Sequence, residues 1–523
     1  MDQFVANHAE HVIGTLSGFD RLVFRGTLRV LAHRWGMLSY LSYARVLLKD
    51  FGKHANALTR QLTDASSALA KRLGRPEQYL QSAATNKEEI ARQIAAADHI
   101  ERGLICILSA VEPCMSYDIV RDGANKRIEI EPRWRKCKFL YHYQMHPRFG
   151  FMHARIQTWF PFAIQICING REWLAHSMDA AGLGYSRRDN CFTWLENPPR
   201  AQRMMDRQRH SDWPALLAPI AHRLNPGYDA MFAGFPMPPY YWSCYQSEWA
   251  TDVMFRDPVI LARLYPSLVH HGLTTFLSTD VMRFLGRKVL ADERVPPRFA
   301  ADVVSDVKHR PEGVRIKHRV GANSVKMYDK QGSVLRVETT INDVDQFKTF
   351  RAPETKPDAA PSWQRMRKGV ADLSRRAEVS QAANQRYLTA LASVEHTTAL
   401  GELTARLSRP VTYKGRRVRA LNPHAPADAA LLAAISRGEF TLNGLRNRDL
   451  CALLFARPGR TKADRKRQGA AISRKLRLLR AHRLIHKVSG THRYHITEAG
   501  RRIVTALMAA RNANTQELAK MAA

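Results

Sequence analysis

The chain has 523 residues, of which 45% are hydrophobic and 24% charged, a globular composition with enough material for roughly three domains. Its 81 lysines and arginines outnumber 47 aspartates and glutamates, and the net charge of +34 attracts polyanions. Nucleic acid is therefore the expected partner. No run of 18 apolar residues occurs and the N-terminus lacks a signal-peptide pattern, so we expect a cytoplasmic protein and no membrane contact.

Seven cysteines are spread along the chain without any C-x-x-C pair. This spacing argues against a disulfide framework and against a zinc ribbon. We expect most of them to be small buried side chains.

Two proline-rich segments, Phe350 to Trp363 and Leu407 to Asp428, interrupt regular structure. They predict an α+β core domain over residues 1–350, a linker and helical connector over 351–410, and a basic domain over 411–523. Residues 411–523 hold 24 lysines and arginines against 6 acids, a net charge of +18. More than half of the total charge thus falls in the last fifth of the chain, which favours a binding surface.

The core domain opens with a strand at "FDRLVFRG", Phe19 to Gly26, and continues with helices to about Asp98. The apolar run "LICILSAVEP" predicts a strand buried on both faces. Four segments with alternating polarity then predict an antiparallel meander. These segments are Lys126 to Pro132, Cys137 to Met145, Phe149 to Phe160 and Phe162 to Trp173. Residues 178–287 have a mainly helical pattern, and further strands, including a hairpin with Gln-Gly at its turn, end the domain.

The basic domain shows a recognisable order of elements: helix, short strand "FTL", helix, helix, hairpin and helix. This order over residues 426–513 resembles the winged helix-turn-helix family, which implies that the third helix enters a nucleic-acid groove and the hairpin forms the wing. In that helix Ile472, Leu476 and Leu479 share one stripe, so the cationic residues between them point elsewhere. The predicted contacts to nucleic acid are Ser473, Arg474, Lys475, Arg477, Arg480, Lys487, His492 and Arg493. DNA and RNA both remain open as targets.

Acids at strand ends are the main lead to chemistry, because the usual nucleotide-binding and hydrolase motifs are absent from the sequence. Asp20 begins one strand and Glu112 ends another. Two such carboxylates can hold Mg²⁺ for phosphodiester cleavage. The alternative is that each acid pairs with a neighbouring arginine, such as Arg21 or Arg25.

An Asp on an early strand and a Glu at the end of a later buried strand resemble the RNase H-like arrangement of nucleases and transposases, here within residues 15–175. The resemblance implies Asp20 and Glu112 as catalytic metal ligands and requires a third acid. Asp280 is the preferred third acid, although its position after Ser278 and Thr279 equally fits the first turn of a helix. Asp329 and Glu338 are further alternatives.

The predicted hairpin at "VKMYDKQGSVLRVET" places four polar side chains close together if its register matches the turn. Lys326, Tyr328 and Arg336 are candidate phosphate ligands, with Tyr328 a possible nucleophile and Glu338 beside them. The strand pair resembles one in phage-type replication initiators, but the His-hydrophobe-His motif of those enzymes is absent. Ion pairing across a solvated sheet face is the favoured interpretation.

Three histidines, His142, His146 and His153, raise the question of a metal site, since imidazole suits zinc or copper. No carboxylate or thiolate stands at a fixed spacing from them. We therefore expect surface or interface histidines.

Several stretches, among them "GFDRLVFRGTL", "SAVEPCMSY" and "LRVETTIND", resemble a widespread bacterial protein family that carries no established activity. The expectation is a nucleic-acid-binding protein of mobile-element type, acting as a Mg²⁺-dependent nuclease or a transposase-like enzyme. The alternative is a transcription regulator or RNA–protein scaffold, with the core domain serving homodimerisation or shape recognition.

Overall fold

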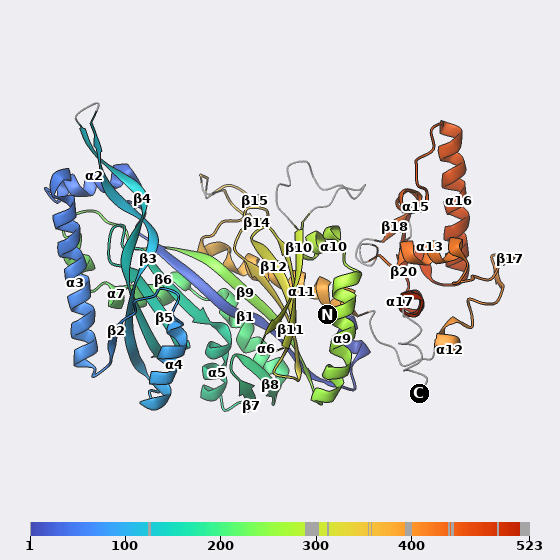
Figure 1. Ribbon diagram of the computed structural model, residues 1–523, viewed down its shortest axis with the longest axis horizontal. Helices are drawn as coiled ribbons and strands as arrows, with labels where there is room; N and C mark the ends of the chain where they lie inside the picture. The colour runs from blue at the N-terminus through green and yellow to red at the C-terminus, as the bar shows by residue number, and fades with distance from the viewer. Residues whose placement is uncertain are drawn as a thin grey trace. The chain divides into compact units, whose positions relative to one another are not determined.

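A computed structural model describes residues 2–123, 127–287, 303–310, 313–353, 355–356, 358–392, 400–437, 440, 444–488 and 491–512 (Figure 1). The chain divides into two compact units, and both are built from separate stretches of sequence. Unit 1 comprises Met1–Ile13, Asp252–Thr339 and Ala382–Ala523, and unit 2 comprises Gly14–Thr251 and Thr340–Gln381.

Unit 2 contains most of a large mixed sheet, in the strand order β9-β1-β6-β5-β4-β3-β2. The bounds are β1 Val12–Thr27, β2 Glu77–Tyr79, β3 Gly103–Asp122, β4 Arg127–His146, β5 Gly150–Gln157, β6 Ile164–Asn169 and β9 Tyr241–Phe255. Strands β3 to β6 form an antiparallel meander, whereas β2 pairs with β3 in parallel. The predicted meander is thus confirmed, although two of its expected segments merge into the single long strand β4.

Helices pack on both faces of this sheet. The helices of unit 2 are α2 Arg34–Tyr43, α3 Phe51–Arg72, α4 Lys87–Ala97, α5 Gly170–Ala180, α6 Pro198–Arg207, α7 Trp213–Leu224 and α8 Tyr228–Met231, with 3-10 turns at Leu48–Asp50, Gln208–His210 and Val370–Asp372. On α3, Phe51, Leu58 and Leu62 recur at helical spacing and pack in one core with Leu140 and Ile156 of the sheet. Helix α4 packs through Ala91 against a separate cluster of sheet residues.

Two small hairpins complete unit 2. These are β7 Tyr185–Arg188 with β8 Cys191–Leu195, and β14 Lys348–Arg351 with β15 Ser362–Arg365. In the second hairpin Phe350 pairs with Trp363, so the ends of the proline-rich segment meet. The predicted domain boundary there is wrong, because residues 340–381 belong to unit 2.

Unit 1 contains the strands in the order β10-β11-β12-β13, followed by the last residues of β9. Its elements before the basic domain are α1 Asp2–Asn7, α9 Pro258–Thr274, α10 Ser278–Phe284, β10 Val303–Arg310, β11 Gly313–Val320, β12 Asn323–Lys330, β13 Val334–Ile341 and part of α11 Leu373–Leu391. Leu264, Leu268, Ile316, Val337 and Leu388 meet in one buried core. The predicted hairpin of β12 and β13 is present, with Gln331 and Gly332 at positive φ in its turn.

The basic domain follows in unit 1. Its elements are α12 Leu400–Thr404, β16 Val411–Tyr413, β17 Arg416–Val418, α13 Pro426–Ile435, β18 Leu445–Arg446, α15 Asn447–Leu454, α16 Lys462–Ala481, β19 Ile485–Lys487, β20 Arg493–Ile496 and α17 Glu498–Asn512. Strands β18, β20 and β19 form a three-stranded sheet in that order. The expected "FTL" strand lies largely outside the described residues, and β18 takes its place in the order of elements.

The α+β fold class is confirmed, since helices and a large mixed sheet occur together. The predicted single domain over residues 1–350 is wrong, because β1, β9 and β13 each pass from one unit to the other. The mainly helical interpretation of residues 178–287 missed β9, together with the hairpin of β7 and β8.

Candidate functional sites

Asp20 lies on β1 in the interior of unit 2, with 4% of its surface exposed. The amide nitrogen of Asn190 donates to both carboxylate oxygens of Asp20, at 3.0 and 3.1 Å. Asn190 is held in the two-residue turn between β7 and β8, where Asp189 adopts φ +54°. Asp and Asn tolerate this left-handed conformation better than most residues, so the turn chemistry places the amide over the acid.

A second acid, Glu248 of β9, approaches Asp20. Ligand oxygens of the two carboxylates lie within 4.8 Å of one another, and Glu248 is partly buried. Gln246 donates to Glu248 Oε1 at 3.0 Å, which fixes one side of that carboxylate. Two neighbouring carboxylates supply the hard oxygen ligands that Mg²⁺ and Ca²⁺ prefer. These acids can therefore hold a metal ion.

Glu112 does not join Asp20. Strands β6, β5 and β4 separate β1 from β3, so the two acids are four strand spacings apart, or roughly 19 Å. Glu112 also lies inside β3, where it pairs with Cys137 of β4, and not at the end of the strand. The structure thus does not bring together the predicted metal pair of Asp20 and Glu112, on which the RNase H-like resemblance depended.

Glu112 is instead an ion-paired acid. It accepts hydrogen bonds from Tyr141 Oη at 2.5 Å and Arg155 Nη1 at 2.6 Å, and Lys87 Nζ lies 3.2 Å away. Burial by itself would raise the pKa of Glu112, but the hydrogen bond from Tyr141 and the charges of Arg155 and Lys87 lower it below its usual range. This environment keeps the carboxylate ionised and gives it a structural role.

Asp280 is a buried helix-capping acid. Its Oδ2 accepts a hydrogen bond from the Leu277 backbone N–H at 2.8 Å at the N-terminus of α10, and Arg283 lies 3.6 Å from its other oxygen. Capping carboxylates satisfy backbone donors that the helix leaves open. The helix-capping alternative for Asp280 therefore describes the structure, and the predicted role as third catalytic acid has no geometric support.

The polar cluster predicted on β12 and β13 is present. Lys326 Nζ lies 2.6 Å from Glu338 Oε1, and Tyr328 Oη donates to Glu338 Oε2 at 2.7 Å. Glu338 is almost fully enclosed and Lys326 and Tyr328 are partly buried, so the cluster does not lie on a solvated face. Burial alone would raise the pKa of Glu338, but the charge and hydrogen bonds of its partners lower it.

Arg336 belongs to a second buried pair. Its Nε and Nη2 donate to the two oxygens of Asp252 at 2.6 and 2.9 Å, and both side chains are enclosed. A bidentate pair of this kind fixes the planes of the guanidinium and carboxylate groups, and breaking it is costly. Because Lys326, Tyr328 and Arg336 each bond to a carboxylate, the predicted phosphate-binding role would require breaking two ion pairs and the hydrogen bond of Tyr328.

The three histidines do not form one metal site. His142 pairs with Ala154, and His153 with Tyr143, so His142 and His153 lie on opposite faces of the sheet. His142 is buried with Nε2 3.2 Å from Ser66 Oγ, and burial lowers its pKa to about 4. The expectation of surface or interface histidines is wrong for His142.

Helix α16 carries exposed cations from its first residue, Lys462, to Arg474. Ile472, Leu476 and Leu479 are buried as predicted, in the core of the basic domain. Ser473 and Arg474 are exposed, whereas Lys475, Arg477 and Arg480 are partly buried. The helix begins at Lys462, so four further exposed cations precede the predicted contacts. These are Lys462, Arg465, Lys466 and Arg467.

The residues predicted to contact nucleic acid differ in their bonds and in their exposure. Ser473 donates to the Gly469 carbonyl and accepts from Asn447, which joins α16 to α15. Arg480 lies over the ring of Tyr413 at 5.7 Å. In the β19–β20 hairpin Lys487 and His492 are exposed and Arg493 is partly buried. Arg474, Lys487 and His492 are thus, with Ser473, the exposed members of the predicted contact set.

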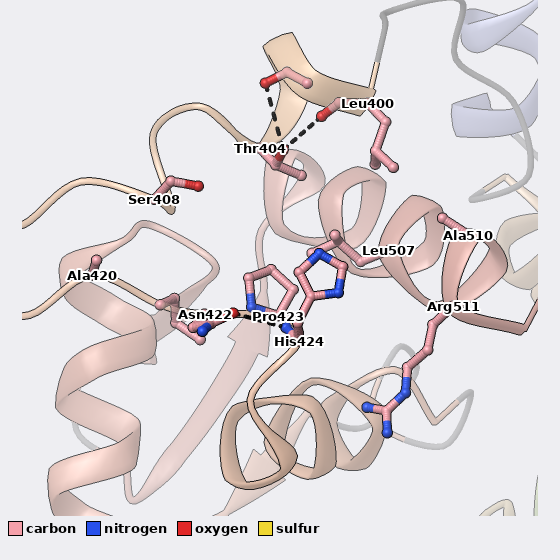
Figure 2. A pocket seen from close by; sticks show the side chains of 12 residues that line it. Leu400, Thr404, Ser408, Ala420, Asn422, Pro423, His424, Leu507, Ala510 and Arg511 are labelled. Carbon is pink, nitrogen blue, oxygen red and sulfur yellow. Dashed lines mark hydrogen bonds between the residues drawn. The ribbon is translucent and has the colours of Figure 1, made fainter.

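A further cavity lies beside α17 in the basic domain, with a volume of about 590 Å³. Figure 2 shows His424, Pro423 and Asn422 of one loop facing Leu507 and Arg511 of α17. Thr404 donates to the Leu400 carbonyl at 2.7 Å and closes one side. The described lining residues include no carboxylate, so they do not form a metal site.

Comparison of the chain with protein-family models, with curated proteins and with solved structures found no match. Among the described residues, no helix combines the length and apolar character needed to cross a membrane.

Sequence reasoning missed Glu248 and Asn190 because their neighbours in space are far away in the chain. The Asp-Asn dipeptide between two short polar runs was a usable turn signal. Nothing in the sequence shows that this turn reaches Asp20.

Loss of the Lys326 ammonium should destabilise unit 1. We expect Lys326→Met to lower the free energy of unfolding by about 3 kcal/mol, because it leaves Glu338 buried without its cation. The double variant Lys326→Met/Glu338→Gln should regain part of this loss. Urea unfolding would measure the stability of the single and the double variant. The control is Lys308→Met, since Lys308 is an exposed residue of β10. Equal stability of Lys326→Met and the control would contradict this assignment.

The Asp20 and Glu248 carboxylates should bind a divalent ion. We expect calorimetry of the full chain to show one Mn²⁺ site that Mg²⁺ competes for, and Asp20→Asn or Glu248→Gln to remove it. Glu77→Gln, on exposed β2, is the control. Unchanged Mn²⁺ binding in Asp20→Asn would show that the ion binds elsewhere.

Proposed function

We propose that the protein binds nucleic acid through its basic domain, with α16 in a groove and the β19–β20 hairpin as a wing. The observation that carries the proposal is the division of α16 into a buried apolar stripe and an exposed cationic surface. A helix of this kind fits the major groove, which is about 12 Å wide. The order of helices and strands around it supports the resemblance to winged helix-turn-helix proteins.

The exposed cations of α16 extend from Lys462 to Arg474, a stretch of 13 residues that spans about 18 Å of helix. Phosphates follow each other every few ångströms along nucleic acid, so several can be contacted at once. Phosphate contacts give affinity and position, whereas sequence preference needs contacts to base edges. The basic domain therefore accounts for binding, and DNA and RNA are both acceptable partners.

We propose further that unit 2 makes the protein a Mg²⁺-dependent enzyme that cleaves or transfers phosphodiester bonds. Asp20 and Glu248 would hold Mg²⁺, and Asn190 would keep the Asp20 carboxylate in place. When bound, the ion supplies an activated water and stabilises charge on a phosphoryl oxygen. If these acids bind no metal, a regulator or RNA–protein scaffold is the function that the basic domain supports.

Removing exposed cations from α16 should weaken binding to every nucleic acid alike. We expect Arg465→Gln/Lys466→Gln/Arg474→Gln to reduce the slope of log affinity against log salt by up to about 3, since each neutralised phosphate contributes about 1 to that slope. Fluorescence anisotropy over a salt series would measure the slope. The matched control removes three exposed cations from α3: Lys53→Gln/Lys71→Gln/Arg72→Gln. An equal decrease in both triple variants would indicate attraction by net charge alone.

Cleavage should depend on Asp20. The protein is purified without nuclease treatment, the co-purifying nucleic acid is sequenced, and the complex is incubated with Mg²⁺. We expect the wild type and Glu77→Gln to cut it, and Asp20→Asn and Glu248→Gln to bind it without cutting. Binding without cleavage by the wild type would favour the regulator or scaffold.

A further inference from the structure

A polar and aromatic pocket opens in unit 2, on one face of the large sheet. Arg25, Gln165, Arg155 and Tyr141 stand directly across from one another on β1, β6, β5 and β4, and so share one face. The pocket measures about 260 Å³ and includes Arg25, Trp134, Arg155, Gln157, Gln165 and Tyr245 in its lining.

Two large aromatic side chains of the pocket are exposed to solvent. Trp134 of β4 has 72% of its surface exposed, and Tyr245 of β9 has 50%. Exposed rings of this size bury no core surface, but they offer flat platforms for stacking. Cations lie beside one of them, since Arg25 is 6.0 Å and Lys368 is 4.9 Å from the centre of the Tyr245 ring.

The polar groups deeper in the pocket are held in fixed orientations. Arg155 donates Nε and Nη2 to Gln165 Oε1 at 3.0 and 2.7 Å, while its Nη1 bonds to Glu112. The two bonds from Arg155 engage the side-chain carbonyl of Gln165 and leave the amide nitrogen of Gln165 as a donor. Gln157, only 2% exposed, donates its amide nitrogen to the carbonyls of Met115 and Phe160, which leaves its own carbonyl as an acceptor.

We propose that this pocket binds one unpaired base of a single-stranded nucleic acid. The base would stack on Trp134 or Tyr245, its edge would meet the amide groups of Gln157 and Gln165, and Arg25 and Lys368 would contact the adjoining phosphates. Recognition of single strands commonly combines aromatic stacking with a cationic groove. The volume lies just below the range of about 300–1,000 Å³ for pockets that take drug-sized molecules, which suits a single base.

This inference deepens the proposed function and rests on it, because it assumes that nucleic acid is the partner. It adds a preference for single strands that the cations of α16 do not supply. The two surfaces are separable by experiment, since the pocket variants change stacking and the α16 variants change charge.

The test is anisotropy of a labelled 12-nucleotide single strand and of the matching duplex with the full chain. We expect Trp134→Ala and Tyr245→Ala to weaken single-strand binding about tenfold, the usual size of one stacking contact, and to leave duplex binding unchanged. Trp134→Phe keeps an aromatic ring and should retain most of the affinity. The control is Trp35→Ala on α2, where the indole is 79% exposed and lies outside the pocket.

The outcomes separate the two proposals. Equal single-strand affinity of Trp134→Ala, Tyr245→Ala and Trp35→Ala, with wild-type binding intact, would overturn the pocket and leave the α16 surface standing. Absence of any binding by the wild type would overturn both. AMP and an unlabelled single strand can each be tested as competitors of the labelled strand. If AMP displaced the labelled strand at concentrations as low as the unlabelled strand requires, the pocket would be assigned to a free nucleotide instead.

Discussion

The cost of burying charge is the constraint on which the rest of this structure depends. An unpaired ion inside a protein costs several kcal/mol, and three charged side chains of the sheet bond to partners of opposite charge. Arg336 bonds to Asp252, Lys326 to Glu338, and Arg155 to Glu112. A shift of one residue in strand register would turn these side chains to the other face and separate every pair. Each pair therefore specifies the register of its strands as well as neutralising a charge.

The same constraint explains where function is found. Glu112 holds two cations at hydrogen-bonding distance and is structural. Asp20 and Glu248 differ in that two carboxylates approach each other, an arrangement that a divalent ion stabilises. At the surface, charge can remain hydrated at little cost, and the basic domain presents its cations there along α16. Binding and chemistry thus fall on different elements of the proposed enzyme.

Local patterns in the sequence predicted much of the fold and little of the site. Alternation of polar and apolar residues identified the meander and the β12–β13 hairpin, because side-chain direction in a strand has a period of two. It failed for β9, where Ser247, Thr251 and Asp252 are buried next to apolar neighbours and no alternation remains. The prediction that Glu112 ends a strand is wrong because β3 continues through Pro113. Its partner β2 ends opposite Ser109 and leaves that edge free of ladder hydrogen bonds, so a proline is tolerated there.

The approach of Asp20, Asn190 and Glu248 joins residues that are far apart in the chain, and no local pattern encodes it. The buried stripe of α16 was predictable because helical spacing is local, whereas the start of that helix at Lys462 depended on its cap at Thr461.

The central claim is that the basic domain is the nucleic-acid surface. Ultraviolet crosslinking of the full chain to its co-purified nucleic acid, followed by mass spectrometry of the linked peptides, tests it most directly. Crosslinks concentrated within residues 462–493 are the predicted result. Crosslinks confined to unit 2, in a complex that binds with undiminished affinity, would contradict the claim.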